Sequence, residues 1–309
     1  MSGGVDTLDR RGLWVAAGSF VLWGLMPLYW HLLKAVPSLQ IVAHRIVWSA
    51  LLVVGWLLWK QGRGWLRAAL ARPRVAWMLA LSGLLIGFNW GLYIWAVNAG
   101  HVIETSLGYF INPLLNVLFG VVLLGERLNR VQWSSVAIAT VGVLWLTFNY
   151  GAFPWIALAL AVSFALYGLI RKLVAIDSIP GLGVESVYLF VPALALMAWG
   201  ESHGAGGFLP MDGAPGWGLA LGLLLVVGGA LTALPLIGFA YAVRRVPLSV
   251  VGLMQYIAPT LQLLCGVFVF HEVFDRDRAI GFGFIWLALA LFAVDGWLRS
   301  RRQAAMSAA

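Results

Sequence analysis

The chain has 309 residues, of which 62% are hydrophobic and only 10% are charged, and its mean hydropathy is +0.91. Soluble globular domains carry roughly 25% charged residues, so this composition excludes a water-soluble domain as the main body of the protein. The formal net charge of +8 does not indicate a nucleic-acid partner, because the basic residues cluster between long apolar runs, as in a membrane protein.

The apolar runs are long enough to cross a bilayer as helices, which need about 20 residues each. Because the hydrocarbon core offers no water to the backbone, each run must satisfy its own hydrogen bonds as an α-helix. The first run is expected to stay as a membrane helix, since no signal-peptide cleavage site precedes it. The sequence therefore predicts an all-α membrane protein with ten transmembrane helices, over residues 12–33, 39–59, 75–98, 102–124, 132–149, 152–170, 183–200, 217–241, 248–270 and 279–298.

The basic residues fall mainly on one side of the predicted membrane. With the N-terminus in the cytoplasm, sixteen of the 20 Lys and Arg residues lie in cytoplasmic segments, most densely in the linker 60–74. The other four are Lys34, Arg45, Arg276 and Arg278. This bias is the positive-inside pattern, and it predicts that the short tails 1–11 and 299–309 are both cytoplasmic.

The two halves of the chain repeat the same motifs at an offset of 144 to 146 residues. Ser19–Leu25 aligns with Ser163–Leu169, and Phe110–Pro113 aligns with Tyr256–Pro259. Five spans per half is an odd number, so the second half must cross the membrane in the opposite direction. Chance similarity among apolar helices is the alternative, and the constant offset counts against it. We therefore predict two inverted five-helix repeats, an architecture typical of secondary transporters. Their predicted limits are 12–149 and 152–298.

Ordered motifs along nearly the whole chain resemble one known family. They are Ala43–Ser49, Gly87–Trp90, Trp95–Asn98, Ser106–Leu114 and Gln255–Thr260. These motifs are similar to the RarD-like branch of the EamA family, which belongs to the drug/metabolite transporter superfamily. The resemblance implies ten helices, a bacterial inner-membrane location, and export or exchange of small metabolites or amphiphilic drugs. It does not fix a substrate.

An intramembrane enzyme and a channel are the rival classes. An enzyme needs a nucleophile with its base, or a cluster of metal ligands, facing one cavity. The five His residues are scattered, Cys265 has no evident partner, and no Walker A loop for ATP occurs. A channel is disfavoured by the repeat and by the lack of a filter-like segment. We therefore expect a secondary transporter that uses no cofactor or metal. Its expected partners are a small-molecule substrate, the lipid bilayer and, if transport is coupled, protons, while the oligomeric state stays open.

Arg45 is the clearest candidate for substrate binding. It lies about six residues into the second predicted span, and a charge inside the membrane needs a reason to be there. One interpretation is a cavity-facing cation that holds an anionic group of the substrate; the alternative is snorkelling to the outer interface or pairing with Glu104. His44 is a second candidate, with simple packing as its alternative. Glu104 and Glu185 are candidates for proton coupling, with solvation or helix capping as the alternative.

Polar and aromatic residues in the third, fourth and ninth spans predict the rest of a cavity. Asn112 and Asn116 are four residues apart, so they share a helical face, and Gln255 and Gln262 share another. Interhelical hydrogen bonding is the alternative for these amides. The remaining candidates for substrate contact are Asn89, Trp90, Tyr93, Tyr109 and Tyr256.

Pro113 and Pro259 occupy matched positions in the two halves. Each proline removes a helix hydrogen bond and frees a carbonyl about one turn earlier. The pair therefore predicts hinges around which alternating access flexes, and static kinks for packing are the alternative.

Overall fold

The computed structural model describes residues 9–99, 101–149, 151–208, 216–271 and 275–307, and each element in these ranges is a helix. Within them, 10 helical segments are long and apolar enough to cross a membrane, which confirms the predicted all-α membrane fold. The helices are α1 (Arg10–Leu32), α2 (Ser38–Gln61), α3 (Gly64–Leu70), α4 (Pro73–Asn98), α5 (Val102–Val122), α6 (Arg130–Asn149), α7 (Trp155–Leu173), α8 (Ser178–Ser202), α9 (Gly218–Val243), α10 (Leu248–Met254), α11 (Ile257–Phe268) and α12 (Arg276–Ser307).

Local sequence explains where several helices begin. The side chain of Asp9 accepts hydrogen bonds from the backbone N–H groups of Arg11 and Gly12, at 2.9 and 3.2 Å, and so caps α1. Asn129 and Gln132 form a reciprocal capping box at the start of α6, with each side chain accepting the backbone N–H of the other. These caps satisfy donors that the first turn of a helix leaves free.

The predicted ninth span is divided in the structure. α10 ends at Met254 and α11 begins at Ile257, so that Gln255 lies at the break. Pro259 stands in the first turn of α11, a position where the missing N–H costs no helix hydrogen bond. The N–H of Ala258 donates to the Gln255 carbonyl over a tighter turn, at 3.1 Å. Its counterpart α5 runs unbroken through Pro113, so the two matched prolines have different local structures.

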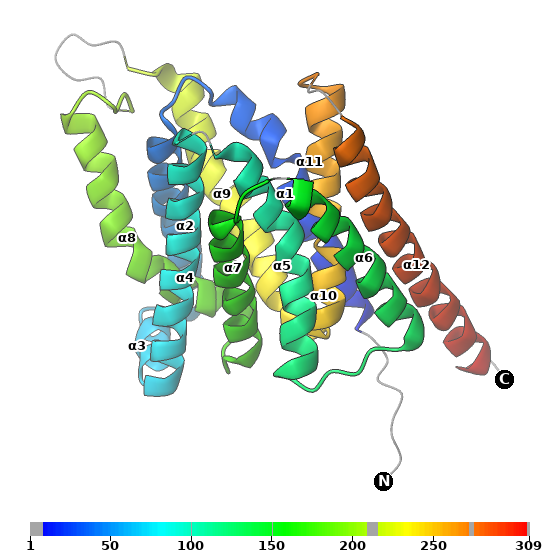
Figure 1. Cartoon of the computed structure of the whole chain (residues 1–309). Coiled ribbons are helices and arrows are strands. Elements are labelled where there is room, and N and C mark those ends of the chain that lie inside the picture. The colour runs from blue at the N-terminus through cyan, green and yellow to red at the C-terminus, as the bar shows by residue number, and fades with distance from the viewer. Residues whose placement is uncertain (1–8, 100, 150, 209–215, 272–274, 308–309) are drawn as a thin grey trace.

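The two halves of the chain pack in matching pairs (Figure 1). α2 packs on α8, and α6 packs on α12, each helix against its counterpart in the other half. α5 packs on α7 as α11 packs on α1, and α4 packs on α7 as α9 packs on α1. Exchanging the halves leaves this set of pairs unchanged, so each half packs on the other in a matching way.

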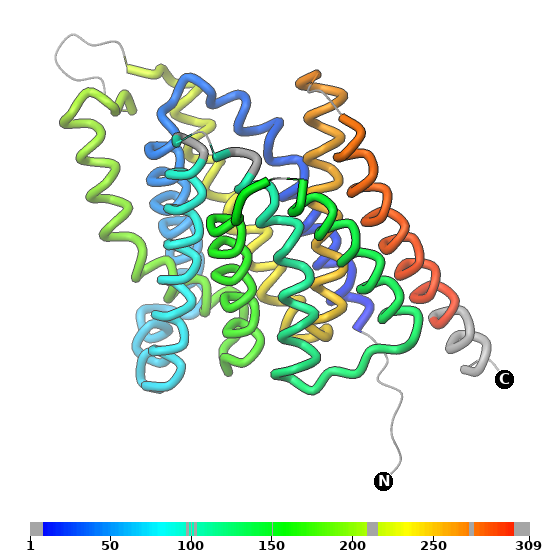
Figure 2. The backbone as a smooth tube through the Cα atoms, viewed as in Figure 1, coloured from blue at the N-terminus to red at the C-terminus, as the bar shows by residue number. Residues whose placement is uncertain are grey.

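The chain crosses repeatedly between two faces of the bundle (Figure 2). α1 begins and α12 ends on the same face, which also carries α3 (Figure 1). We call this the basic face, because the linkers there carry Lys60, Arg63, Arg67, Arg72 and Arg74. The other face is called the distal face.

Candidate functional site: a cavity between the two halves

A cavity of about 390 Å³ lies at the seam between the two halves. Its walls come from α1, α2, α4 and α5 of the first half and from α7, α9 and the α10–α11 region of the second. The lining residues of α2 run from Ser38 to Arg45, at the distal end of that helix, whereas those of α1 begin at Phe20, near its middle. The cavity therefore occupies the distal half of the bundle.

Most of the predicted substrate contacts line this cavity. They are Arg45, Asn89, Trp90, Tyr93, Tyr109, Asn112, Gln255 and Gln262. Of the predicted set, His44, Asn116 and Tyr256 do not line it. The structure thus gathers predicted side chains from four regions of the sequence around one space, namely α2, α4, α5 and the α10–α11 region.

Arg45 is the only charged residue among the lining residues that the structure describes. Its Nε donates to the hydroxyl oxygen of Thr232 in α9, at 2.9 Å. Its Cζ lies 4.5 Å from the ring centroid of Trp30 and 5.3 Å from that of Trp90, within cation–π range. No carboxylate pairs with Arg45 within the described ranges. The side chain therefore faces the cavity between two indole rings and does not snorkel to the interface.

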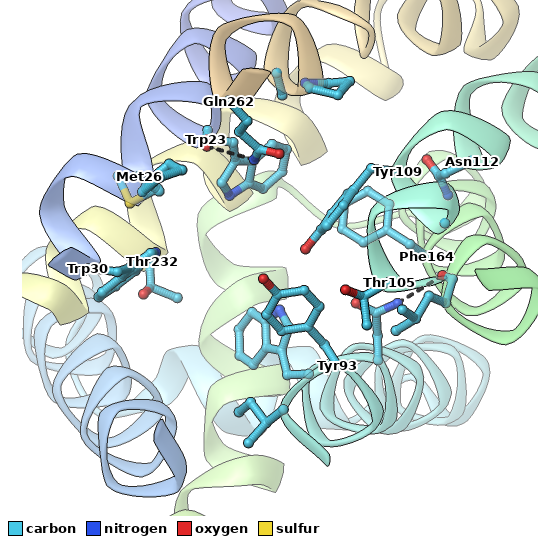
Figure 3. A pocket seen from close by; sticks show the side chains of 18 of the residues that line it. Trp23, Met26, Trp30, Tyr93, Thr105, Tyr109, Asn112, Phe164, Thr232 and Gln262 are labelled. Carbon is cyan, nitrogen blue, oxygen red and sulfur yellow. Dashed lines mark hydrogen bonds between the residues drawn. The ribbon is translucent and has the colours of Figure 1, made fainter. Parts of the chain in front are cut away.

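Two tyrosines project into the cavity from neighbouring helices. Figure 3 shows the hydroxyl groups of Tyr93 (α4) and Tyr109 (α5) directed toward the open centre of the pocket. Their ring centroids are 6.0 Å apart and nearly perpendicular. Neither hydroxyl makes a hydrogen bond to another residue that the structure describes, so both remain available to a ligand.

The predicted amides divide between cavity and helix packing. Asn112 donates to the carbonyl of Ala161 at 2.8 Å, and Asn116 donates to the side-chain oxygens of both Asn112 and Gln255. Asn116 is fully buried beneath the cavity and joins α5 to the α10–α11 break. These bonds link the two halves, as the hydrogen-bonding alternative describes, and of these three amides Asn112 and Gln255 also line the cavity.

Asn89 and Gln262 are likewise held by the backbone. Asn89 donates to the carbonyl of Leu160 at 2.8 Å and to the hydroxyl of Ser163 at 2.9 Å. Gln262 donates to the carbonyl of Trp23 at 3.2 Å, a bond drawn in Figure 3. Each amide keeps its side-chain oxygen for other partners, because only its NH₂ group is used in these bonds.

His44 and Tyr256 lie away from the cavity. The His44 ring packs against Phe208, with centroids 4.9 Å apart, and its Nδ1 accepts a hydrogen bond from the Trp48 indole at 3.1 Å. The Tyr256 hydroxyl donates to the carbonyl of Phe110 at 3.2 Å, between α11 and α5. The His44 contacts agree with its packing alternative, and the Tyr256 hydroxyl is used in contact with α5.

An aromatic cluster closes the cavity toward the basic face. It consists of Phe20, Trp23, Phe164, Tyr167 and Phe239, whose ring centroids lie 5.4 to 6.3 Å from their neighbours. Phe20, Trp23 and Phe164 also line the cavity itself. We call this cluster the aromatic floor.

The two candidate carboxylates have different surroundings. Glu104 accepts a hydrogen bond from the backbone N–H of Ile156 at 2.8 Å, which places it at the start of α7. Glu185 is buried and lies 3.3 Å from Nη1 of Arg171, with the hydroxyl of Ser82 donating to the same carboxylate oxygen. Neither lines the main cavity, so neither is in direct reach of a ligand there.

Some lining residues were not among the predicted contacts. No role in substrate contact was predicted for Trp30, Met26, Thr105, Phe164 and Thr232. Thr232 is a hydroxyl-bearing residue within the very apolar α9. A polar residue in such a span could have been identified from the sequence as a candidate for substrate contact. Figure 3 shows these side chains facing the same space as Tyr93 and Tyr109.

The described part of the chain holds no group of three or more His, Cys, Asp or Glu side chains arranged to bind a metal ion. The polar groups around the cavity are one guanidinium, two phenols and several amides and hydroxyls. Such groups bind and orient a ligand through hydrogen bonds and charge.

The chain is similar to proteins of one family of transporters. The profile of the EamA-like transporter family matches residues 10–148. The chain is 46% identical to Protein RarD of Streptomyces exfoliatus, covering 96% of this chain and 92% of that protein. It is 45% identical to the transporter YojE of Bacillus subtilis, covering 95% and 97%, and 41% identical to Protein RarD of Escherichia coli K12, covering 95% and 97%. A protein of known crystal structure superimposes with a TM-score of 0.69 at 19% identity, over 94% of this chain and 99% of that one; that likeness concerns the fold alone.

Proposed function

Because the chain belongs to the EamA-like transporter family, we propose that it is a secondary transporter that carries a small molecule through the seam between its halves. The family is one of transporters and not of enzymes. The observation that carries the proposal is the one-sided position of the cavity, whose lining extends to Trp30 and Ser38 near the distal helix ends and to Phe20, Trp23 and Phe164 of the aromatic floor. A carrier that exposes one site alternately to two sides passes through such a state.

The basic face is proposed to lie in the cytoplasm, at the inner membrane of a bacterium. The support is the concentration of Lys and Arg in the linkers on that face, as the positive-inside rule describes. In the proposed orientation the cavity faces away from the cytoplasm, as the substrate site of a carrier does in an outward-facing state.

A polar contact on the basic face supports closure on that side. Glu126 accepts hydrogen bonds from the backbone N–H groups of Leu248 and Ser249, at 2.6 and 2.8 Å, and from the Ser249 hydroxyl at 2.7 Å. Lys172 lies 3.5 Å from the same carboxylate and donates to the Val243 carbonyl. We call the contact of Glu126 with Lys172 and the start of α10 the Glu126 latch. It joins the end of α5 to the ends of α7 and α9 and the start of α10.

Opening toward the cytoplasm requires the aromatic floor to separate and the Glu126 latch to release. The helix is interrupted at Gln255, four residues before Pro259, whereas α5 is continuous, so Pro259 is the better candidate for a hinge. Pro113 lies inside a continuous helix and is proposed to act, if at all, through the bend that it imposes.

Glu185 is the better of the two candidates for proton coupling. Its carboxylate interacts with the side chain of Tyr167, and both residues line a small pocket of about 20 Å³, room for about one water molecule. Trp90 lines this pocket and the main cavity as well, so one indole ring separates Glu185 from the substrate space. The carboxylate of Glu104, in contrast, already caps α7.

Transport is tested with purified protein in proteoliposomes. Amino acids, nucleobases and amphiphilic drugs are first screened for thermal stabilisation, and the hits are then tested in counterflow, which a carrier supports and a channel does not. Replacing Arg45, Asn112 and Gln255 together by alanine is expected to abolish counterflow. Retention of full counterflow by this triple variant would refute the cavity as the transport site.

Coupling is tested with the Glu185→Gln variant, and Glu104→Gln is its matched control. If Glu185 carries the proton, Glu185→Gln keeps counterflow but loses accumulation driven by a pH gradient, whereas Glu104→Gln keeps both. If only Glu104→Gln lost gradient-driven accumulation, coupling would belong to Glu104, and the proposal for Glu185 would be wrong.

A further inference from the structure

The cavity presents hydrogen-bond donors around one unpaired cation. Arg45 has five N–H donors, of which only the Nε bond to Thr232 is satisfied by a residue that the structure describes. Its terminal nitrogens, at the Cζ end held between Trp30 and Trp90, therefore have no protein acceptor there. The planar guanidinium fork is suited to bidentate binding of a carboxylate.

The rest of the cavity adds donors but no negative charge. The hydroxyls of Tyr93 and Tyr109 point toward the same open centre (Figure 3). Asp and Glu are absent from the described lining residues, so an ammonium group on a ligand would meet Arg45 without a compensating carboxylate. An anionic group meets one fixed positive charge and two phenolic donors.

An unpaired guanidinium inside a membrane protein is costly, and such residues are usually paired. Arg171 shows this solution in the same chain, since it is paired with Glu185. Two indole faces and one threonine hydroxyl compensate Arg45 only in part. A bound anion completes the compensation, which gives the anion a binding advantage over a neutral molecule of the same shape.

The shape of the cavity describes the remainder of the ligand. Its volume of about 390 Å³ lies within the usual range for small-molecule pockets, about 300–1,000 Å³. Beyond Arg45 the walls are flat and apolar, formed by Trp23, Trp30, Trp90 and Phe164. Rings of this kind stack on a planar hydrocarbon or aromatic body.

We infer that the substrate is an amphipathic organic monoanion, with a carboxylate held by Arg45, Tyr93 and Tyr109 and an aromatic or flat apolar body packed against the indole walls. The inference rests on the proposed function, because it assigns the ligand of the same cavity. It selects one class from the metabolites and drugs that the family resemblance leaves open.

The test uses three probes of similar size and different charge: 3-phenylpropionate, 3-phenylpropionamide and 3-phenylpropylamine. Binding to the purified protein is measured by thermal stabilisation and by quenching of tryptophan fluorescence, since Trp23, Trp30 and Trp90 line the cavity. Because hydrogen bonds to charged groups are the stronger ones, the carboxylate is expected to bind at least about tenfold more tightly than the amide. The amine is expected to bind most weakly.

Arg45→Gln is expected to remove the advantage of the carboxylate over the amide, and Arg45→Lys to keep part of it, because the charge remains but the fork is lost. Arg74→Gln is the matched control, since it removes one positive charge from an exposed position on the basic face. It should leave all three affinities unchanged. Melting of each variant without ligand shows whether it is folded.

The outcomes separate this inference from the proposed function. Tighter binding of the amide or the amine, an unchanged carboxylate preference in Arg45→Gln, or no binding of any probe would each overturn the anion inference. Counterflow of another compound by the same protein would then still support a transporter. Conversely, Arg45-dependent binding of the carboxylate without any counterflow in proteoliposomes would support the anion site and count against transport.

Discussion

The arginines in the distal and basic halves of the seam differ in whether a carboxylate pairs with them. In the distal half Arg45 faces a cavity and has no carboxylate partner in the described structure. Toward the basic face Arg171 is fully buried, with Nη1 at 3.3 Å from Glu185 and Nη2 donating to the Ser178 carbonyl at 2.9 Å. Gly181 makes this fit possible, because a side chain there would overlap the Arg171 guanidinium.

This difference distinguishes a charge that is paired within the protein and holds helices together from a charge that is available to bind a ligand. A buried ion pair holds its two helices in one arrangement, since removing either partner leaves the other uncompensated. An arginine that has indole faces but no carboxylate can accept an anion without first losing a protein partner. The comparison therefore assigns Arg171 a role in packing the helices of the seam and Arg45 a role in binding the ligand.

The largest expected effect comes from breaking the Arg171–Glu185 pair. Glu185→Met leaves a buried guanidinium without its carboxylate, and the expected loss in free energy of unfolding is about 3–5 kcal/mol. The measurement is detergent-solubilised thermal or SDS unfolding. The double variant Arg171→Met/Glu185→Met should recover most of the loss, because no charge then remains unpaired. Equal stability of the single and double variants would contradict a structural role for the pair.

This pair also shows what the sequence could not provide. Arg171 was counted among the cytoplasmic basic residues, and Glu185 was placed at the start of a span beginning at residue 183. The helix in fact begins at Ser178, with Pro180 in its first turn, so Glu185 lies two turns inside. Hydropathy locates apolar runs, but it does not show that a helix extends beyond its apolar run or which side chain meets it from another helix.

The fold and much of the cavity were within reach of the sequence. The span count follows from bilayer thickness and backbone hydrogen bonding, and the family resemblance is confirmed. Helical spacing found Asn112 and Gln255, which line the seam. It could not separate them from Asn116, because residues four apart share a face but differ by about 6 Å in depth along the helix. His44 does not line the cavity although Arg45 does, because consecutive residues of a helix point about 100° apart.

A smaller effect is expected at the Glu126 latch. Glu126→Ala removes the acceptor for two backbone N–H groups at the start of α10, a loss comparable to removing a helix cap, about 0.5–2 kcal/mol. Hydrogen exchange in the segment 248–254 should therefore quicken. Ser249→Ala is the matched control, because it deletes only the hydroxyl bond of 2.7 Å and leaves both N–H bonds in place. Unchanged exchange in Glu126→Ala would show that the contact does not hold the basic face closed.

Neutralising Arg45 should change stability less than breaking the latch, although it should change ligand binding more. Arg45→Gln loses a hydrogen bond worth about 0.6 kcal/mol in a membrane protein and also removes an unpaired charge. These terms oppose each other, so the melting temperature without ligand should stay close to that of the unaltered protein. A loss as large as that of Glu185→Met would mean that Arg45 has a structural partner after all, and the distinction between the two halves would fail.

The smallest effect is expected for the ion pair between Arg244 and Asp177, whose atoms approach to 2.9 Å on the basic face. Asp177 is 81% exposed, and exposed pairs contribute about 0–1 kcal/mol, less at high salt. Asp177 stands at the N-cap of α8, but its side chain makes no capping hydrogen bond. Asp177→Asn therefore tests the ion pair alone. If this variant lost as much stability as Glu185→Met, burial would not be what distinguishes the charges of the seam from those of the surface. A small, salt-sensitive loss of stability would instead indicate that desolvation is the reason that Arg171 must be paired. The same desolvation would favour binding of an anion by Arg45, which has no carboxylate partner in the described structure.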